Sequence, residues 1–140
     1  MKTFQHPDGV WRDRANYLLF LELPENGMRE QIWARSLGNQ TFEVCCLPFL
    51  AYGVALGDIV EAPDNIVKRV VTPSGRRLLR IYFRDVSWAR EVVDELTNAC
   101  CLVELRGHLV AIDAVDDTLR SWVIEKMGRY EDEDVLHLEF

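Results

Sequence analysis

Apolar and polar residues along the first half of the chain follow the pattern of short β-strands. Residues 17–23 form an apolar run that ends at a Pro-Glu-Asn-Gly turn, which is typical of a buried strand. Residues 29–37 and 41–47 alternate between apolar and polar positions on either side of a Gly-Asn turn. These three segments therefore predict an antiparallel meander.

Two more short strands are expected before residue 75. Segments 59–62 and 66–72 flank a Pro-Asp-Asn turn, and short strands at this spacing are typical of a small barrel. Residues 1–16 contain a proline, a glycine and mixed charges without periodicity. We therefore expect a loose N-terminal lead-in at residues 1–16 and a small, partly closed β-barrel at residues 17–75.

The pattern changes to mixed strand and helix after this point. Residues 77–84 alternate as a strand, and Asp85 precedes a segment in which apolar residues recur at helical spacing up to Ala99. Two strands at 101–105 and 108–115 follow, joined by an Arg-Gly turn. This half of the chain is therefore expected to combine a sheet with helices.

A second helix and a last strand complete the pattern. The helix is expected to begin at Asp116 and to end near Gly128, and residues 135–140 alternate again. The order β-α-β-β-α-β over residues 76–140 indicates a ferredoxin-like half with helices on one face of an antiparallel sheet. The predicted fold class is α+β, with the barrel fused to this half and packed against it as one compact unit.

Charge is unevenly distributed along the chain, whose net charge is −7. Residues 1–84 carry 11 Lys/Arg and 9 Asp/Glu, whereas residues 85–140 carry 5 and 14. The negative total argues against a protein that binds nucleic acid without sequence preference, because that class displaces counterions with basic surface. An acidic C-terminal surface that binds a basic protein partner is one hypothesis, and an ordinary solvated face is its alternative. The residues expected to form this surface are Asp113, Asp116, Asp117, Glu131, Asp132, Glu133 and Asp134.

Basic residues gather after the turn at Gly75. Arg76, Arg80 and Arg84 alternate onto one face of the expected strand. With the backbone N–H groups of Gly75 they would suit an anion, since turn amides and guanidinium groups both bind phosphate or carboxylate. The alternative is an edge strand whose arginines are solvated or paired within the chain.

The sequence contains no set of residues that specifies a reaction. The cysteines form two adjacent pairs, Cys45-Cys46 and Cys100-Cys101, which lack the spacing of a zinc-binding loop. We expect them to be buried, reduced thiols. The three histidines are not expected to lie near one another. The sequence therefore predicts no catalytic residue, metal site or cofactor.

Hydropathy gives no sign of a membrane protein. No stretch approaches the roughly 18 consecutive apolar residues that a membrane span needs. The first eight residues also lack the apolar core of a secretory signal. These features predict a cytoplasmic protein.

The most specific segment runs from Leu47 to Val60, with the sequence Leu-Pro-Phe-Leu-Ala-Tyr-Gly-Val-Ala-Leu-Gly-Asp-Ile-Val. A Ser-Gly turn then precedes a strand that contains Arg80, and a later apolar run ends at Asp113 before an acidic helix cap. Over roughly residues 17–140 this combination resembles a bacterial family known as domain of unknown function family 4265.

The chain departs from that family's pattern at two positions. Cys46 stands where an asparagine-like residue often precedes the Pro-Phe pair, and Ala114 stands where a proline often follows the aspartate. The resemblance implies the fold and a bacterial cytoplasmic setting. It implies no activity.

Two hypotheses of different classes follow from these observations. The leading one is a non-catalytic interaction protein of immunity or antitoxin type, which binds a basic partner through the acidic surface. The alternative is a small-ligand or anion-binding domain, with or without catalysis, whose site lies between the loop from Phe49 to Asp58 and the strand of Arg80. Assembly of identical chains through an exposed sheet edge is left open as a third role.

Overall fold

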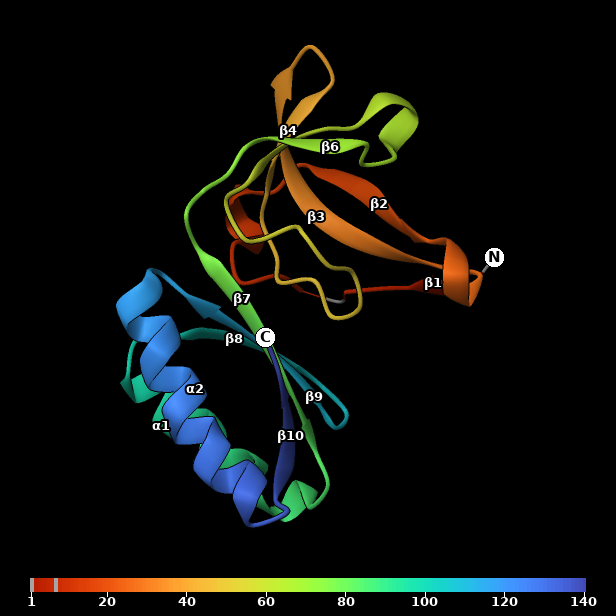
Figure 1. The fold of residues 1–140 in the computed structure, drawn as a ribbon. Helices are drawn as coiled ribbons and strands as arrows, with labels where there is room; N and C mark the ends of the chain where they lie inside the picture. The colour runs from red at the N-terminus through yellow and green to blue at the C-terminus, as the bar shows by residue number, and fades with distance from the viewer. Residues whose placement is uncertain (1, 7) are drawn as a thin grey trace. The chain divides into compact units, whose positions relative to one another are not determined.

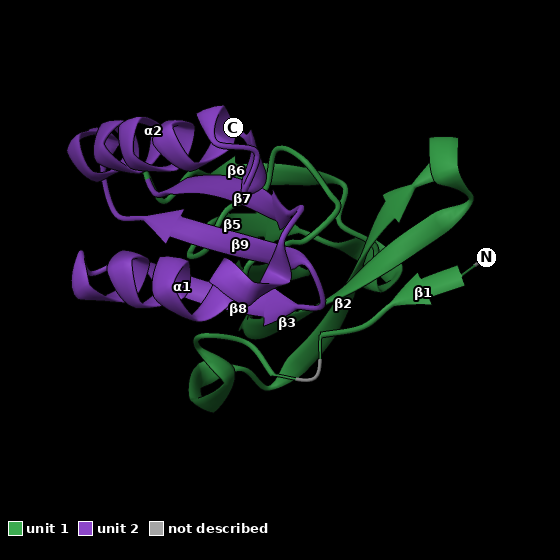
Figure 2. Ribbon diagram, turned by 90° about the horizontal axis from the view of Figure 1, so that it is seen from below, with its two compact units in different colours: residues 1–75 green, residues 76–140 purple. Residues whose placement is uncertain are grey.

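The chain forms two compact units, residues 1–75 and residues 76–140 (Figure 2). The computed structural model describes residues 2–6 and 8–140, so Met1 and Pro7 of the expected lead-in lie outside the described part. Each unit contains one β-sheet, and the second unit adds two α-helices (Figure 1). The α+β class is therefore confirmed, whereas packing of the two parts as one body stays a prediction. Within the described residues, no helix is long and apolar enough to cross a membrane.

Unit 1 is built around the long strand β3 (Met28–Gly38). Along one edge β3 pairs antiparallel with β2 (Tyr17–Leu23), and along part of the other edge it pairs with β4 (Thr41–Val44). β5 (Ile59–Glu61) and β6 (Arg69–Thr72) continue the antiparallel sheet beyond β4. The strands of the expected meander are thus all present.

The sheet of unit 1 does not close into a barrel over the described residues. Its order is β1-β3-β4-β5-β6, with β2 attached to β3. A single isolated bridge, Phe20 to Ile66, links β2 to the segment that precedes β6. The two edges part after this bridge, because β6 pairs with β5 instead.

The core of unit 1 lies on one face of its strands. Alternation directs Leu19 and Leu21 of β2 and Ile32 and Ala34 of β3 inward, where all four are buried. The same alternation in β3 directs Glu30 inward, and its side chain is fully buried among these apolar residues. A charged group at such a position requires partners, which are described below.

The expectation of a loose lead-in at residues 1–16 is wrong for its first residues. β1 (Lys2–Phe4) pairs parallel with residues Met28 to Glu30 of β3. His6 is buried, and its ring lies against Phe49 with centroids 4.7 Å apart. A strand of three residues is too short to show periodicity in the sequence, so only the packing of its side chains reveals it.

Unit 2 contains an antiparallel sheet with the order β10-β7-β9-β8. Its helices are α1 (Ala89–Asn98) and α2 (Asp117–Asp132), which cover one face of this sheet (Figure 1). Apolar residues of the helices and of alternate strand positions form one core between them. The strands are β7 (Arg77–Phe83), β8 (Leu102–Arg106), β9 (Leu109–Ala114) and β10 (Leu136–Glu139).

Carboxylates begin both helical segments, as the sequence indicates. Asp85 accepts a hydrogen bond from the N–H of Ser87 in a 3-10 turn before α1, and Asp116 accepts one from the N–H of Leu119 at the start of α2. The expected end of the second helix at Gly128 is wrong, because α2 continues to Asp132. The extra turn places the Tyr130 hydroxyl 2.9 Å from Glu95 of α1, to which it donates a hydrogen bond.

Candidate functional site

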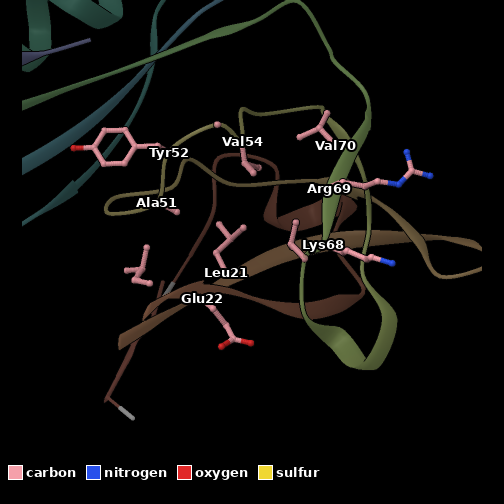
Figure 3. Close-up of a pocket in the computed structure, with 11 residues that line it drawn as sticks. Leu21, Glu22, Ala51, Tyr52, Val54, Lys68, Arg69 and Val70 are labelled. Carbon is pink, nitrogen blue, oxygen red and sulfur yellow. The ribbon is translucent and has the colours of Figure 1, made fainter. Parts of the chain in front are cut away.

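A pocket of about 320 Å³ lies within unit 1 (Figure 3). Three segments line it: residues 21–23 of β2, residues 51–54 of the loop after β4, and residues 67–70 at the start of β6. Its volume is at the lower end of the range for small-molecule sites, which is about 300–1,000 Å³.

The pocket exists because two chain segments meet and then separate. The N–H of Val67 donates to the carbonyl of Phe20 at 2.9 Å, which sets the two segments side by side and parallel. Beyond this contact β2 stays with β3, whereas β6 turns away to pair with β5. The pocket occupies the space that opens between residues 21–23 and 67–70.

Apolar side chains lie at the base of the pocket, most of its accessible lining is polar, and its rim is charged. Leu21, Val54 and Val70 turn toward the centre, whereas Lys68 and Arg69 project together to one side (Figure 3). Arg69 forms an ion pair with Glu61 at 3.3 Å. Lys68 is exposed, and its ammonium has no carboxylate partner among the described residues.

Glu30 fixes one end of the pocket loop. Its Oε2 accepts from the N–H of Phe49, and its Oε1 accepts from the N–H groups of Leu50 and Ala51 at 2.9 and 3.0 Å. His6 Nε2 lies 2.5 Å from Oε2, and both side chains are fully buried. Three consecutive backbone amides and one imidazole therefore surround a single buried carboxylate.

These partners keep Glu30 ionised. Burial raises its pKa, but the hydrogen bond and charge of His6, together with the N–H groups of Phe49 and Leu50, outweigh burial and hold the pKa below its ordinary value. An ionised carboxylate only accepts hydrogen bonds, so His6 must carry a proton on Nε2 and donate it. The pair is thus a buried, directional anchor for the loop.

Asp58 fixes the other end of the loop. Its Oδ2 accepts from the N–H of Ala55 at 2.9 Å, and its Oδ1 accepts from the N–H of Ser74 at 2.8 Å. Gly57 precedes it with φ +80°, a left-handed conformation that glycine adopts without strain. The pocket residues 51–54 therefore lie between two buried carboxylates that both bind backbone amides.

The expected acidic surface is not one surface. Asp113 is buried and paired with Arg76, and Asp117 pairs with Arg77 at 2.8 Å. Burial raises the pKa of Asp113, which Arg76 only partly opposes, whereas the hydrogen bond from Arg77 lowers the pKa of Asp117. Asp116 is used as the N-cap of α2.

The remaining acidic residues lie at the opposite end of α2. This helix has 16 residues, so its ends are about 24 Å apart at 1.5 Å per residue. Glu131 accepts from the N–H of Leu138, and Asp134 lies 4.0 Å from Arg84. Asp132 and Glu133 are exposed and have no ion pair among the described residues. The seven carboxylates were grouped by their charge, although three lie near the start of α2 and four near its end.

The expected anion site is not assembled in unit 2. Arg76, Arg80 and Arg84 each face a different carboxylate, and for Arg80 this is Glu139 at 3.2 Å. Gly75 has φ +85° and forms the turn as expected. The second half of that hypothesis, a site between the loop from Phe49 to Asp58 and the Arg80 strand, concerns both units and stays a prediction.

The division into units also changes the distribution of charge. Residues 76–140 hold nine Lys/Arg and fourteen Asp/Glu, a net charge of −5, and residues 1–75 hold seven and nine, a net charge of −2. The arginines at 76, 77, 80 and 84 belong with the acidic half and pair with it. Most of the contrast seen along the sequence therefore disappears within the fold.

The cysteines follow the expectation of buried thiols with one exception. Cys45, Cys46 and Cys101 are buried, and all four are unbridged. Burial raises the pKa of Cys45 and Cys101 to about 11. Cys100 is exposed because it lies in the turn after α1, where its φ is +71°.

Sequence reasoning missed both the pocket and its anchors. Glu30 carries a detectable signal, because it shares the inward face of β3 with Ile32 and Ala34. His6 carries none, since its partner is 24 positions away. The pocket residues are ordinary strand and loop residues. They surround one space only because β2 and the segment before β6 meet at Phe20 and Val67 and then separate.

A family model described as "Domain of unknown function (DUF4265)" matches residues 30–138. The chain belongs to this family. The match includes Glu30, Asp58 and the whole pocket loop, and leaves out β1, His6 and β2. Family membership assigns no activity.

The fold also has a solved counterpart. It is similar to the crystal structure of a hypothetical protein from Neisseria gonorrhoeae, with a TM-score of 0.74 and 18% sequence identity. The similarity covers 87% of this chain and 91% of that chain. Among curated proteins, no sequence matches this member of the family.

Proposed function

We propose that the protein is a non-catalytic binding domain whose ligand occupies the pocket of unit 1. The supporting observation is an apolar floor beside an exposed cation that has no carboxylate partner among the described residues. Such a site suits a small ligand with an apolar body and one anionic group, which Lys68 and Arg69 would bind. This is the ligand-binding alternative from the sequence, with its basic residues supplied by the start of β6.

The design of the loop supports a binding role. Glu30 and Asp58 hold the wall at both ends, so the pocket is largely formed before a ligand arrives and binding costs little ordering. The described lining contains no histidine, cysteine or hydroxyl nucleophile other than the phenol of Tyr52. We therefore favour recognition over chemistry at this site.

A thermal-shift experiment with matched variants tests the proposal. The panel consists of inorganic phosphate, isovalerate and longer branched carboxylates, each at millimolar concentration. A ligand at a hundred times its dissociation constant should stabilise the folded protein by about 2.7 kcal/mol. Val70→Trp should abolish the shift by filling the pocket, and Val71→Trp, a neighbouring exposed position outside the lining, should preserve it.

The outcomes are separable. Loss of the shift in both tryptophan variants would place the ligand elsewhere. A wild-type midpoint that no compound raises would contradict the proposal. Lys68→Ala should weaken binding of the anionic compounds without changing the midpoint of the unliganded protein, because this side chain is exposed.

A second candidate is the interaction protein of immunity or antitoxin type. Its support is now confined to the exposed carboxylates of Asp132 and Glu133 at the end of α2, in a unit whose net charge is −5. Copurification from the native host tests it. A basic partner that is retained by the wild type and lost from the double variant Asp132→Lys, Glu133→Lys would support it, and recovery of no partner at low salt would count against it.

We also propose the finer fold assignments. The order β7-α1-β8-β9-α2-β10 with the sheet order β10-β7-β9-β8 supports a ferredoxin-like unit 2. The bridge between Phe20 and Ile66 supports a partly closed barrel in unit 1. Cytoplasmic location stays a prediction from the sequence.

A further inference from the structure

The backbone of β2 presents a free hydrogen-bonding position to the pocket. In an antiparallel pair, a residue directs both its N–H and its C=O either toward the partner strand or away from it, and neighbouring residues alternate. The carbonyl of Phe20 accepts from Val67, so Phe20 points away from β3. Glu22, two residues further along, must point the same way.

Nothing in the described part of the chain occupies that position beside Glu22. The segment that bonds to Phe20 leaves the edge of β2 after Val67, and the N–H of Lys68 donates to Glu61 instead. The N–H and C=O of Glu22 therefore face the pocket, and Glu22 is one of its lining residues. An exposed strand edge of this kind pairs readily with another extended chain.

We infer that the occupant of the pocket is an extended peptide that pairs with β2 at Glu22. This rests on the proposed function, because it takes the pocket as the binding site and names the ligand class. The peptide continues the pairing that Val67 begins at Phe20, and its own amide and carbonyl satisfy those of Glu22.

The side chains around the pocket define which peptide fits. Successive residues of a strand point to opposite faces, so one peptide side chain enters the pocket toward Leu21 and Val54, which are 6% and 7% exposed. An apolar residue suits this floor. Lys68 and Arg69 project together at the rim, so the peptide carries a carboxylate next to the apolar residue, from an acidic side chain or from a chain end (Figure 3).

Charge makes the rim selective. Arg69 already has Glu61, whereas Lys68 has no carboxylate partner in the described chain, so Lys68 supplies the attraction. The carboxylate of Glu22 points downward in the view of Figure 3, whereas Lys68 and Arg69 extend to the right. A basic side chain placed beside Lys68 and Arg69 would be repelled by them.

The experiment uses the full chain labelled with ¹⁵N and follows its amide signals by NMR. The probes are two series of acetylated peptides in which X is valine, leucine or phenylalanine. One series is the pentapeptide Thr-X-Glu-X-Thr with an amidated end, and the other is the tetrapeptide Thr-X-Thr-X with a free carboxyl end. Isovalerate is the small acid for comparison. At least one peptide should shift the signals of Glu22 and its neighbours in the pocket, and the better series identifies the source of the carboxylate.

N-methylation of each peptide amide in turn tests strand pairing directly. Methylation of one particular amide should weaken binding about tenfold, since a hydrogen bond contributes about 1–1.5 kcal/mol. Lys68→Glu should weaken it further, whereas Lys126→Glu on α2 makes the same charge change in the other unit and should have little effect.

Each remaining outcome overturns the inference. If isovalerate shifts the pocket signals and no peptide binds more tightly, the pocket is a small-molecule site and only the proposed function survives. If neither shifts them up to millimolar concentration, both fail. If N-methylation is silent at every position, the peptide does not pair with β2. If the Glu22 signal depends on protein concentration without peptide, a second copy occupies the edge.

Discussion

Replacing Glu30 with glutamine should cost about 3–5 kcal/mol of folding free energy, because it breaks a buried ion pair. The structure allows the figure to be worked from individual contacts. Oε1 accepts from Leu50 and Ala51, and Oε2 accepts from Phe49 and His6. The amide of glutamine has one oxygen, so it keeps at most one of these two pairs and turns an NH₂ group toward the other.

Two buried donors are then left without acceptors, at about 1–3 kcal/mol each. When the glutamine oxygen stays with Leu50 and Ala51, one of these two donors is the Nε2–H of His6. The cost of breaking a buried pair and the cost of the unsatisfied donors both come to several kcal/mol. This is a large part of the about 5–15 kcal/mol by which a folded protein is typically stabilised. For a chain of this size the melting midpoint should fall by roughly 10–20 °C.

Urea denaturation and calorimetry of Glu30→Gln measure this loss directly. Glu25→Gln is the matched control, since Glu25 is exposed in the 3-10 turn after β2, and it should stay within about 0.5 kcal/mol of the wild type. Amide exchange of Leu50 and Ala51 should accelerate in the Glu30 variant. A difference below about 1 kcal/mol between the two variants would refute the reasoning that the carboxylate anchors the loop.

Three further predictions concern titration, packing and thiol exposure. The pKa of Glu30 lies below 4.5 in the folded state, so the stability that its carboxylate provides is present above that pH and is lost as the pH falls through the folded pKa. In acid denaturation, the wild type should therefore lose more stability than Glu30→Gln between about pH 5 and pH 3. Gly9→Ala would place a Cβ 2.7 Å from the Cβ of Cys46 and should lower the free energy of unfolding in urea by about 1–3 kcal/mol. Gly128→Ala, which lies inside α2 with nothing within 4 Å, should raise it by up to about 1 kcal/mol. Equal effects of the two variants would contradict the close contact between Gly9 and Cys46. Ellman's reagent should titrate one thiol of the native protein rapidly, Cys100, and the other three only on unfolding. A rapid reaction that persists in Cys100→Ser would show that a different thiol reacts.

The sequence predicted the elements of the fold better than their assembly. Helical spacing after Asp85 located α1, an apolar run located β2, and alternation located β3, β4 and β7, because these patterns arise within a single segment. β1 escaped because three residues carry no period. The extension of α2 past Gly128 escaped because the contact of Tyr130 with Glu95 joins two helices that are distant in sequence.

The candidate site depended almost wholly on tertiary contacts. The carboxylates at 113 and 117 were grouped with those at 131–134 on charge alone, and the fold pairs the first two with arginines and separates the groups by the length of α2. Conversely, the inward position of Glu30 on β3 is visible in the sequence pattern, but its partners are not. Its importance comes from the backbone of a loop about twenty positions away, which no local pattern reveals.

The two carboxylates that hold the pocket loop bind it through peptide N–H groups and not through side chains. Every amino acid except proline offers the same N–H, so residues between the anchors are free to change without loosening their attachment. Tyr52, which is 71% exposed, lies in this stretch. The side chains of this short stretch can therefore differ among related chains while its backbone attachment stays the same.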